Sequence, residues 1–314
     1  MRWLGLVVVL GAMGCLPGDG RPEPGELLVE AQRSDEARDG FVTDDGWAVH
    51  FDRFVTALGG VGLGDEAFDV ACIDYSLSFY DRLYDFAVAD TSKLNLHYGL
   101  GTCTLRYRMG SPSDRTILMA GTSEADRELL RDARIDGIFG DDEDEDAEEG
   151  VGLLVEGSAS KDGEQKRFRW LIRQNHAISR CLRPDGSPFR VTLEGGDELV
   201  RAARVLPREL FRKLPDDDAP VLFAPYALAD ADADGVVTLE ELQQVQLPAG
   251  PILEALAGDS NLMLPGQVLS GQITLRELLE KILFPRVASF EGVQGCEFII
   301  SGLSIEGVEP PDGD

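Results

Sequence analysis

The sequence predicts a mixed, mainly β protein, with an antiparallel β-sandwich body followed by a small helical pair around an acidic loop. Apolar residues alternate with polar or small residues along 94–109, as expected for half-buried antiparallel strands. A Lys-Asp-Gly turn at 161–163 separates two further strand-like stretches, which is typical of a hairpin. Carboxylates at regular intervals in residues 230–241 precede a short helical pattern. We therefore expect a β-rich body at 40–218 and a helical region at 219–285.

The N-terminal residues have the features of an export signal. Residues 1–14 contain a basic start, an apolar stretch and small residues before Cys15, as in a secretory signal peptide. Residues 10–15, Leu-Gly-Ala-Met-Gly-Cys, resemble a bacterial lipobox, which implies lipidation of Cys15. Because Leu16 rather than Asp follows, the resemblance implies outer-membrane anchorage through lipid alone. The alternative is ordinary secretion with a free or disulfide-bonded Cys15.

The segment after the signal, residues 15–39, is rich in Gly, Pro, Asp and Glu, and we expect it to be a flexible linker. The body should then contain strands at 47–58, 94–100, 103–109, 151–160, 168–181, 189–193 and 199–205. Helices are expected at 78–86, at 124–133 and from Pro207 onward, since proline suits a first helical turn.

Two stretches are expected to lie outside the packed core. Eight of the nine residues at 141–149 are acidic, which favours a solvated, disordered insert, the alternative being a weak cation-binding segment. Residues 286–314 form a tail whose last five residues should be frayed.

Charge and cysteine content limit the function classes. With 57 acidic and 29 basic residues the net charge is −28, which argues against binding to nucleic acid or anionic lipid. An even number of cysteines beyond Cys15 in an exported chain predicts two disulfides with three possible connectivities. Chain order favours one bond within the body and one that ties the tail to it. The pairs suggested in this way are Cys72–Cys103 and Cys181–Cys296.

The acidic loop reads Asp-Ala-Asp-Ala-Asp-Gly-Val-Val-Thr-Leu-Glu-Glu at 230–241. Carboxylates at positions 1, 3 and 5, glycine at 6 and glutamate at 12 make up the calcium-loop pattern, so the stretch resembles an EF-hand. Calcium takes roughly six to eight oxygen ligands, and the alternating carboxylates supply them from one short loop. The resemblance implies one Ca2+ held by Asp230, Asp232, Asp234, the Val236 carbonyl, Thr238 through water, and Glu241. The alternative is an acidic turn in a chain already rich in aspartate.

A second copy of the loop's end follows. Residues 235–242 recur 36 residues later at 271–278, with the glycine, Thr-Leu, glutamate and leucine retained. EF-hands usually pair through a short strand, so the resemblance implies a degenerate second hand at 266–277, joined to the first at Val237. Its first ligand positions lack carboxylates, so it should bind no ion; these positions are Gly266, Val268 and Ser270. The alternative is that both copies are only helix starts with a threonine N-cap.

Motifs for catalysis are absent from the sequence. The three histidines, His50, His97 and His176, lie far apart, and no zinc-protease, nucleophile-elbow or phosphate-loop pattern occurs. Ser158 and Lys161 fit a Ser-x-x-Lys pattern but without the motifs that accompany it in β-lactamases. We therefore predict a non-enzymatic protein.

The predicted function is that of an exported calcium-binding lipoprotein of the bacterial cell envelope, with one structural Ca2+. Residues 41–51 also resemble uncharacterised lipoproteins of myxobacterial type. One alternative is an adhesion or envelope-assembly protein that calcium stiffens and that meets an envelope partner. The other is a hydrolase or transition-metal-binding domain assembled from the distant histidines.

Overall fold

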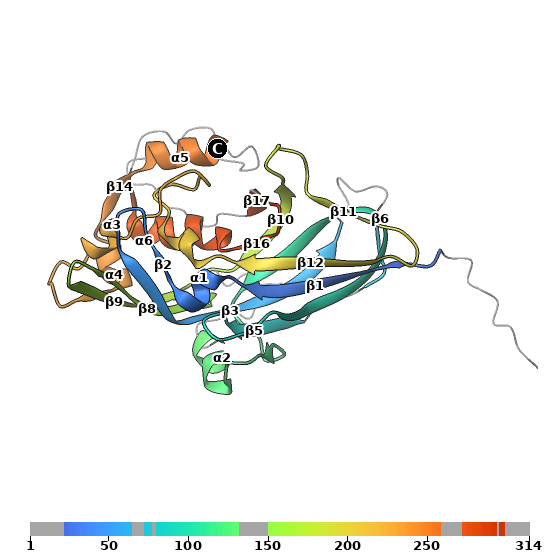
Figure 1. The fold of residues 1–314 in the computed structure, drawn as a ribbon, viewed down its shortest axis with the longest axis horizontal. Helices are drawn as coiled ribbons and strands as arrows, with labels where there is room; N and C mark the ends of the chain where they lie inside the picture. Colours follow the sequence, from blue (N-terminus) through green and yellow to red (C-terminus); the bar gives the residue numbers. More distant parts are fainter. Residues whose placement is uncertain are drawn as a thin grey trace, which may run out of the picture.

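The computed structural model describes residues 22–64, 72–76, 80–131, 150–258, 272–293 and 295–298. Within these ranges the chain is mainly β, as predicted, and most strands belong to one large curled sheet (Figure 1). The strands are β1 Gly25–Arg33, β2 Phe41–Val42, β3 Ala48–Leu63, β4 Ile73–Asp74, β5 Asp81–Asp85, β6 Ser92–Gly110, β7 Ile117–Leu118, β8 Leu153–Lys161, β9 Glu164–Ile172, β10 His176–Leu182, β11 Arg190–Leu193, β12 Glu198–Val205, β13 Val236–Val237, β14 Gln246–Pro248, β15 Gln272–Thr274, β16 Ala288–Phe290 and β17 Gly295–Phe298.

Helical elements are short and lie mostly toward the C-terminal end. The α-helices are α1 Asp35–Asp39, α2 Glu124–Arg131, α3 Ala224–Ala227, α4 Leu239–Leu242, α5 Ala249–Gly258 and α6 Leu275–Glu277. A π-helix, η2 Leu278–Leu283, and two 3-10 helices, η1 Pro207–Phe211 and η3 Phe284–Arg286, complete the set among the described residues.

Two long strands, β3 and β6, organise the sheet. The hydrogen-bonded order is β13-β9-β8-β3-β6-β1-β12-β16, and β6 also pairs with β4, β10 and β11. The sequence suggested two strands on either side of Gly101, but β6 runs through it as one strand of 19 residues. Gly101 has a φ of +90°, a left-handed conformation that glycine adopts without strain, so the strand passes this point without ending.

The sheet is mixed, so the expectation of a purely antiparallel sheet is wrong. β1 pairs with β12 in parallel from Glu26↔Glu198 to Arg33↔Val205, while its other edge is antiparallel to β6. β5–β7 and β13–β9 are also parallel pairs. Alternation within a strand gives its faces but not its neighbours, which is why sequence pattern did not reveal these directions.

β1 and α1 also correct the predicted linker at 15–39, because residues 25–39 are ordered and packed. Leu27, Val29 and Ala31 point into the core and are at most 1% exposed. The residues between them, Leu28 and Glu30, lie at intermediate exposure on the other face. The Gly, Pro, Asp and Glu content of 15–39 favoured a linker, and the alternation of this strand was overlooked.

The helix expected at 78–86 is wrong, because residues 81–85 form β5, paired with β3 and β7. Asp85 at its end is buried and ion-paired with Arg53 at 3.0 Å. By contrast, α2 and η1 occur where the sequence predicted helices.

The predicted hairpin is confirmed. β8 and β9 pair from Leu153↔Ile172 to Lys161↔Glu164, joined by a two-residue turn. Both turn residues have positive φ, 52° at Asp162 and 87° at Gly163, the conformation that an Asp-Gly turn adopts between twisted strands.

One hydrophobic cluster spans the predicted boundary at residues 218 and 219. Its aromatic centre joins β9 to the chain on both sides of that boundary. Trp170 lies 6.1 Å from Phe211 and 5.6 Å from Tyr226, measured between ring centroids. Phe223, beyond the boundary, contacts Phe168 at 6.0 Å. The helical region therefore shares the core of the body.

Both suggested disulfides are present, Cys72–Cys103 and Cys181–Cys296. The second joins β10 to β17, which also pair through their backbones, so this part of the tail is tied to the body. Among the described residues no helix is long and apolar enough to cross a bilayer. The signal peptide, Cys15, the acidic insert at 141–149, residues 266–271 and the chain end at 310–314 lie outside the described residues.

Candidate metal centre

The acidic loop lies between α3 and α4, at the end of the molecule where the β8–β9 hairpin also ends (Figure 1). The structure brings together the first three predicted ligands. Asp230, Asp232 and Asp234 each offer a carboxylate oxygen, and these oxygens lie within 4.8 Å of one another. Asp230 is buried, whereas the other two are exposed, so the group opens to solvent on one side.

Local hydrogen bonds wrap the loop around these carboxylates. Oδ1 of Asp230 accepts from the Asp234 amide at 3.1 Å, and its Oδ2 accepts from the Gly235 amide at 3.0 Å. Oδ1 of Asp234 accepts from the Val236 amide at 2.7 Å. Gly235 has a φ of 81°, so the sharp turn expected of its position is present and needs no strained side chain.

Glu241 lies at the far end of the loop and is not part of the carboxylate group. It caps α4, with Oε2 accepting from the amide and the hydroxyl of Thr238, both at 2.9 Å. Thr238 in turn accepts from the Glu241 amide, which completes a capping box. Val236 lies in β13 opposite Arg167. The structure thus brings three of the four predicted carboxylate ligands together and gives Glu241 and Thr238 a helix-capping role.

Lys166 of β9 is a member of the site that the sequence analysis missed. Its Nζ lies 2.6 Å from Oδ2 of Asp230 and 3.2 Å from Oε1 of Glu164. The bond from Lys166 is the main reason why the pKa of Asp230 is lowered. The sequence did indicate that Lys166 is buried, because it shares the inward face of an alternating strand with Phe168 and Trp170. A lysine at such a position needs a buried partner.

The strand pairing expected between the two loops is wrong. β13 pairs in parallel with β9, and β15, from the second copy, pairs antiparallel with β14. The second copy does reproduce the cap, since Oε2 of Glu277 accepts from the Thr274 amide at 2.9 Å and its hydroxyl at 3.0 Å. The repeated Thr-Leu-x-Glu sequence therefore marks two helix starts of the same geometry.

The segment leading into the loop is anchored by an Asp-Asp-Gly turn at residues 44–46, just before β3. Asp44 Oδ2 accepts from the Val221 amide at 2.8 Å. Asp45 accepts from the amides of Phe223 at 3.2 Å and Ala224 at 2.7 Å. Burial alone would raise the pKa of Asp45, but these bonds and one from Thr43 outweigh it, so its pKa is lowered.

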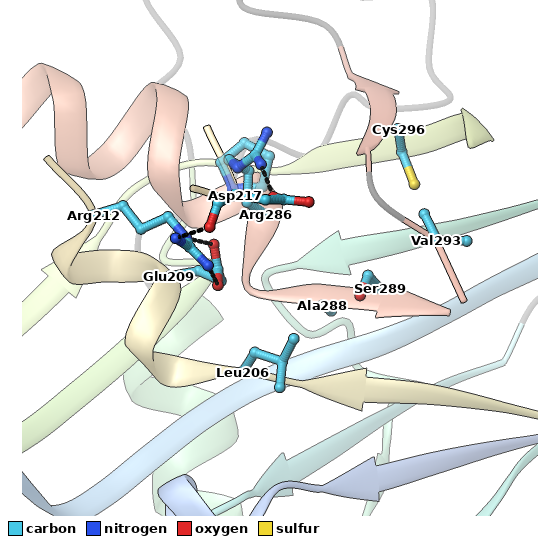
Figure 2. Close-up of a pocket in the computed structure, with 10 residues that line it drawn as sticks. Leu206, Glu209, Arg212, Asp217, Arg286, Ala288, Ser289, Val293 and Cys296 are labelled. Carbon is cyan, nitrogen blue, oxygen red and sulfur yellow. Dashed lines mark hydrogen bonds and ion pairs between the residues drawn. The ribbon is translucent and has the colours of Figure 1, made fainter. Parts of the chain in front are cut away.

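A second group of charges lines a cavity of about 220 Å³ near the start of η1 (Figure 2). We call it the charged cavity, defined by Glu209, Arg212, Asp217 and Arg286. Arg212 donates to both carboxylate oxygens of Glu209, at 2.5 and 2.9 Å, and Arg286 lies 2.6 Å from Oδ1 of Asp217. Figure 2 shows the four charged groups facing one another, with Leu206 below them and Val293 to their right. Desolvation raises the pKa of Asp217 more than Arg286 lowers it.

The histidines do not assemble a site. His50 is exposed on β3, His97 is buried on β6 with Nδ1 3.8 Å from Asp74, and His176 packs 5.2 Å from the Phe284 ring. Within the described ranges, the metal-ligating side chains that come together in a group of three or more are Asp230, Asp232 and Asp234 alone.

No protein-family model, curated protein or solved structure matches this chain. Function is therefore inferred from the chemistry of its own residues. The donor set of the loop consists of carboxylate oxygens, which suit a hard cation such as calcium better than a soft transition metal.

Proposed function

We propose that this protein binds one calcium ion in the loop at residues 230–241, in a structural and non-catalytic role. The observation that carries the proposal is the convergence of Asp230, Asp232 and Asp234 oxygens to within 4.8 Å. Calcium, when bound, supplies two positive charges that offset the repulsion among these carboxylates. The remaining ligands in the proposal are the Val236 carbonyl, Thr238 through water, and Glu241.

Hydrogen bonds within the loop and one from β9 hold its first ligand in place. Asp230 is oriented by three donors, the amides of Asp234 and Gly235 and the ammonium of Lys166. Both capping bonds to Glu241 use Oε2, so Oε1 is the oxygen available to an ion. Six or more oxygens can thus be supplied by the loop with ordered water.

A structural role for the ion is supported by the contact between the loop and the aromatic core beneath it. Val237 is fully buried, and its carbonyl accepts from Nε1 of Trp170 at 2.9 Å. An ion that holds the loop together also holds β13 against β9 and over the aromatic core. Binding at a hundred-fold excess over the dissociation constant stabilises a fold by about 2.7 kcal/mol.

The wider setting belongs to the same proposal. Export by the signal at 1–14, lipidation at Cys15 and outer-membrane anchorage rest on the sequence pattern alone. An EF-hand-like character for 219–285 rests on the sequence of the loop at 230–241 and on its three converging aspartates. A sandwich-like body rests on the curled, mainly antiparallel sheet.

The test is a thermal melt of the full chain in calcium and in chelator. The wild-type chain should melt several degrees lower in chelator. Glu241→Gln should abolish this difference, because glutamine keeps the helix cap but removes the charge at the last ligand position. Glu240→Gln is the matched control, since Glu240 is the exposed neighbour. Equal melting temperatures for the wild-type chain in both buffers would overturn the proposal.

The second candidate is an envelope interaction protein, favoured by a cluster of exposed apolar side chains at the β4–β6 edge. Tyr75 donates its amide to the Tyr98 carbonyl at 2.9 Å, and their side chains are 38% and 40% exposed. Ile73, 49% exposed, lies two residues from Tyr75 on the same face. If this candidate holds, Tyr75→Ser with Tyr98→Ser should lose co-purification of an outer-membrane protein. The calcium-dependent melt should stay unchanged.

A further inference from the structure

Lys166 carries the further inference because its buried ammonium points at the first carboxylate of the loop. The residue is 8% exposed and lies on the same inward face of β9 as Phe168 and Trp170. Its neighbours Gln165 and Arg167 face outward and are exposed. An isolated charge at such a position is strongly disfavoured, so Lys166 needs the carboxylates around it.

Those carboxylates differ in how firmly they are placed. The Asp230 side chain is fully buried, and its Oδ2 accepts both from Lys166 at 2.6 Å and from the Gly235 amide. The Glu164 side chain is 55% exposed, and its Oε1 lies 3.2 Å from the same ammonium. Lys166 therefore has a fixed partner inside the loop and a movable one at the surface.

We propose that Lys166 acts as an internal cation that holds the loop in shape without calcium and lowers its affinity for the ion. The inference rests on the proposed function, since it concerns how the same loop is tuned. It assigns a role to a residue of the β8–β9 hairpin, outside the loop's own sequence.

The physical reason is charge balance. Lys166 neutralises one of the three converging carboxylates, which lessens their mutual repulsion when no ion is bound. The same positive charge repels a divalent cation brought next to Asp230, and this repulsion is strong in a partly desolvated site. Glu164 offers the ammonium a second carboxylate, which eases the repulsion when an ion is bound.

A purely supporting role for Lys166 makes the opposite prediction. If the lysine only positions Asp230 for calcium, its removal should leave the ligand loosely held and weaken binding. If it acts as a competing charge, its removal should tighten binding. The two roles are therefore separated by the sign of the change in calcium affinity.

The central variant is Lys166→Met, which keeps the length of the apolar stem and removes the charge. Arg167→Gln is the matched control, because it removes one positive charge from the adjacent, outward-facing position of the same strand. Calcium dissociation constants are measured by titration calorimetry on the full chain after chelator treatment, and melting temperatures are measured in chelator.

Lys166→Met should bind calcium at least about tenfold more tightly than the wild-type chain, because it removes a positive charge next to the first ligand. In chelator it should melt at a lower temperature, because Asp230 has lost its buried partner. Arg167→Gln should stay within about twofold of wild-type affinity, since an exposed charge is screened. If the wild-type chain binds calcium and Lys166→Met binds it equally well or more weakly, the role proposed for Lys166 is overturned and the proposed calcium binding is not.

A second variant keeps the test decisive if Lys166→Met does not fold. Glu164→Gln alters an exposed side chain and takes the charge from the second partner of Lys166. It should weaken calcium binding by about two- to fivefold, because the ammonium then rests on Asp230 alone. Unchanged or tighter binding would contradict the inference. Absence of calcium heat in the wild-type chain and every variant would instead overturn the proposed function.

Discussion

The acidic loop and the charged cavity both combine carboxylates with basic side chains, but the charges balance in the cavity and do not balance in the loop. In the cavity two carboxylates meet two guanidinium groups, as Glu209–Arg212 and Asp217–Arg286. In the loop three carboxylates converge beside one ammonium, and two of the three are exposed. Each carboxylate of the cavity is therefore neutralised by a guanidinium group. In the loop, two of the three negative charges are not neutralised by Lys166, so a further cation can bind there. The comparison shows that local imbalance, rather than the number of charges, distinguishes a candidate ion site from a structural ion-pair network.

The largest expected effect is on stability, at the cavity. Arg212→Met should lower the free energy of unfolding by about 3–5 kcal/mol, because it leaves the buried Glu209 carboxylate without its partner. Arg212 also donates to the backbone carbonyls of Asp217 and Ala219, so the turn that leads toward the loop loses its support as well. Urea denaturation of the full chain measures the change.

Arg169→Gln is the control for this variant. Arg169 pairs with Glu156 at 2.6 Å but its side chain is 53% exposed, so the loss should be under about 1 kcal/mol. Similar losses for the two variants would mean that the cavity pairs are no more structural than a surface pair.

An intermediate effect concerns pH. The pKa of Asp45, which anchors the segment before the loop, is lowered, so its stabilising contribution is present above about pH 4 and is lost as the pH falls through its folded pKa. The pKa of Asp217 is raised by burial, so its contribution is largest below about pH 4 and declines as the pH rises through its folded pKa. We expect Asp45→Asn and Asp217→Asn to change the pH profile of stability in opposite directions.

This prediction is checked by unfolding curves of the wild-type chain and both variants between pH 3 and pH 7. The advantage of the wild-type chain over Asp45→Asn should grow with pH, and its advantage over Asp217→Asn should shrink. If the loss of stability changed with pH in the same direction for both variants, the opposite pKa shifts of Asp45 and Asp217 would be contradicted.

The smallest expected effect on stability comes from the loop itself. Asp232→Asn should change the free energy of unfolding in chelator by less than about 0.5 kcal/mol, because Asp232 is exposed and an asparagine oxygen can also accept from the Asp234 amide. Calcium affinity should nevertheless fall at least about tenfold, since one charged ligand is lost. Arg212→Met should show the reverse, a large loss of stability with calcium affinity close to that of the wild-type chain. Calorimetric unfolding in chelator and calcium titration measure the two effects separately.

Features set by local sequence were predictable. The β8–β9 hairpin follows from an Asp-Gly turn between alternating residues, and the capping boxes follow from Thr-Leu-x-Glu. Among the described residues, the three aspartates converge because their spacing and Gly235 determine the loop conformation. The mainly β character came from the same period-two alternation.

Features set by long-range packing were not predictable from one sequence. The strand β1 was hidden because its exposed face carries the charges that suggested a linker, and its pairing partner β12 lies far along the chain. β13 pairs with β9 and not with β15 of the second copy. This pairing also places Lys166 of β9 next to Asp230. An inward-facing lysine was visible in the sequence, but the carboxylate that it contacts was not.

The most direct test of the calcium site is calcium titration of the chelator-treated full chain by calorimetry. We expect saturable binding of one calcium ion per chain, lost in Glu241→Gln and kept in Glu240→Gln. Absence of saturable heat in the wild-type chain at millimolar calcium, the range in which extracellular calcium sites of about 10⁻⁴–10⁻³ M affinity fill, would contradict it.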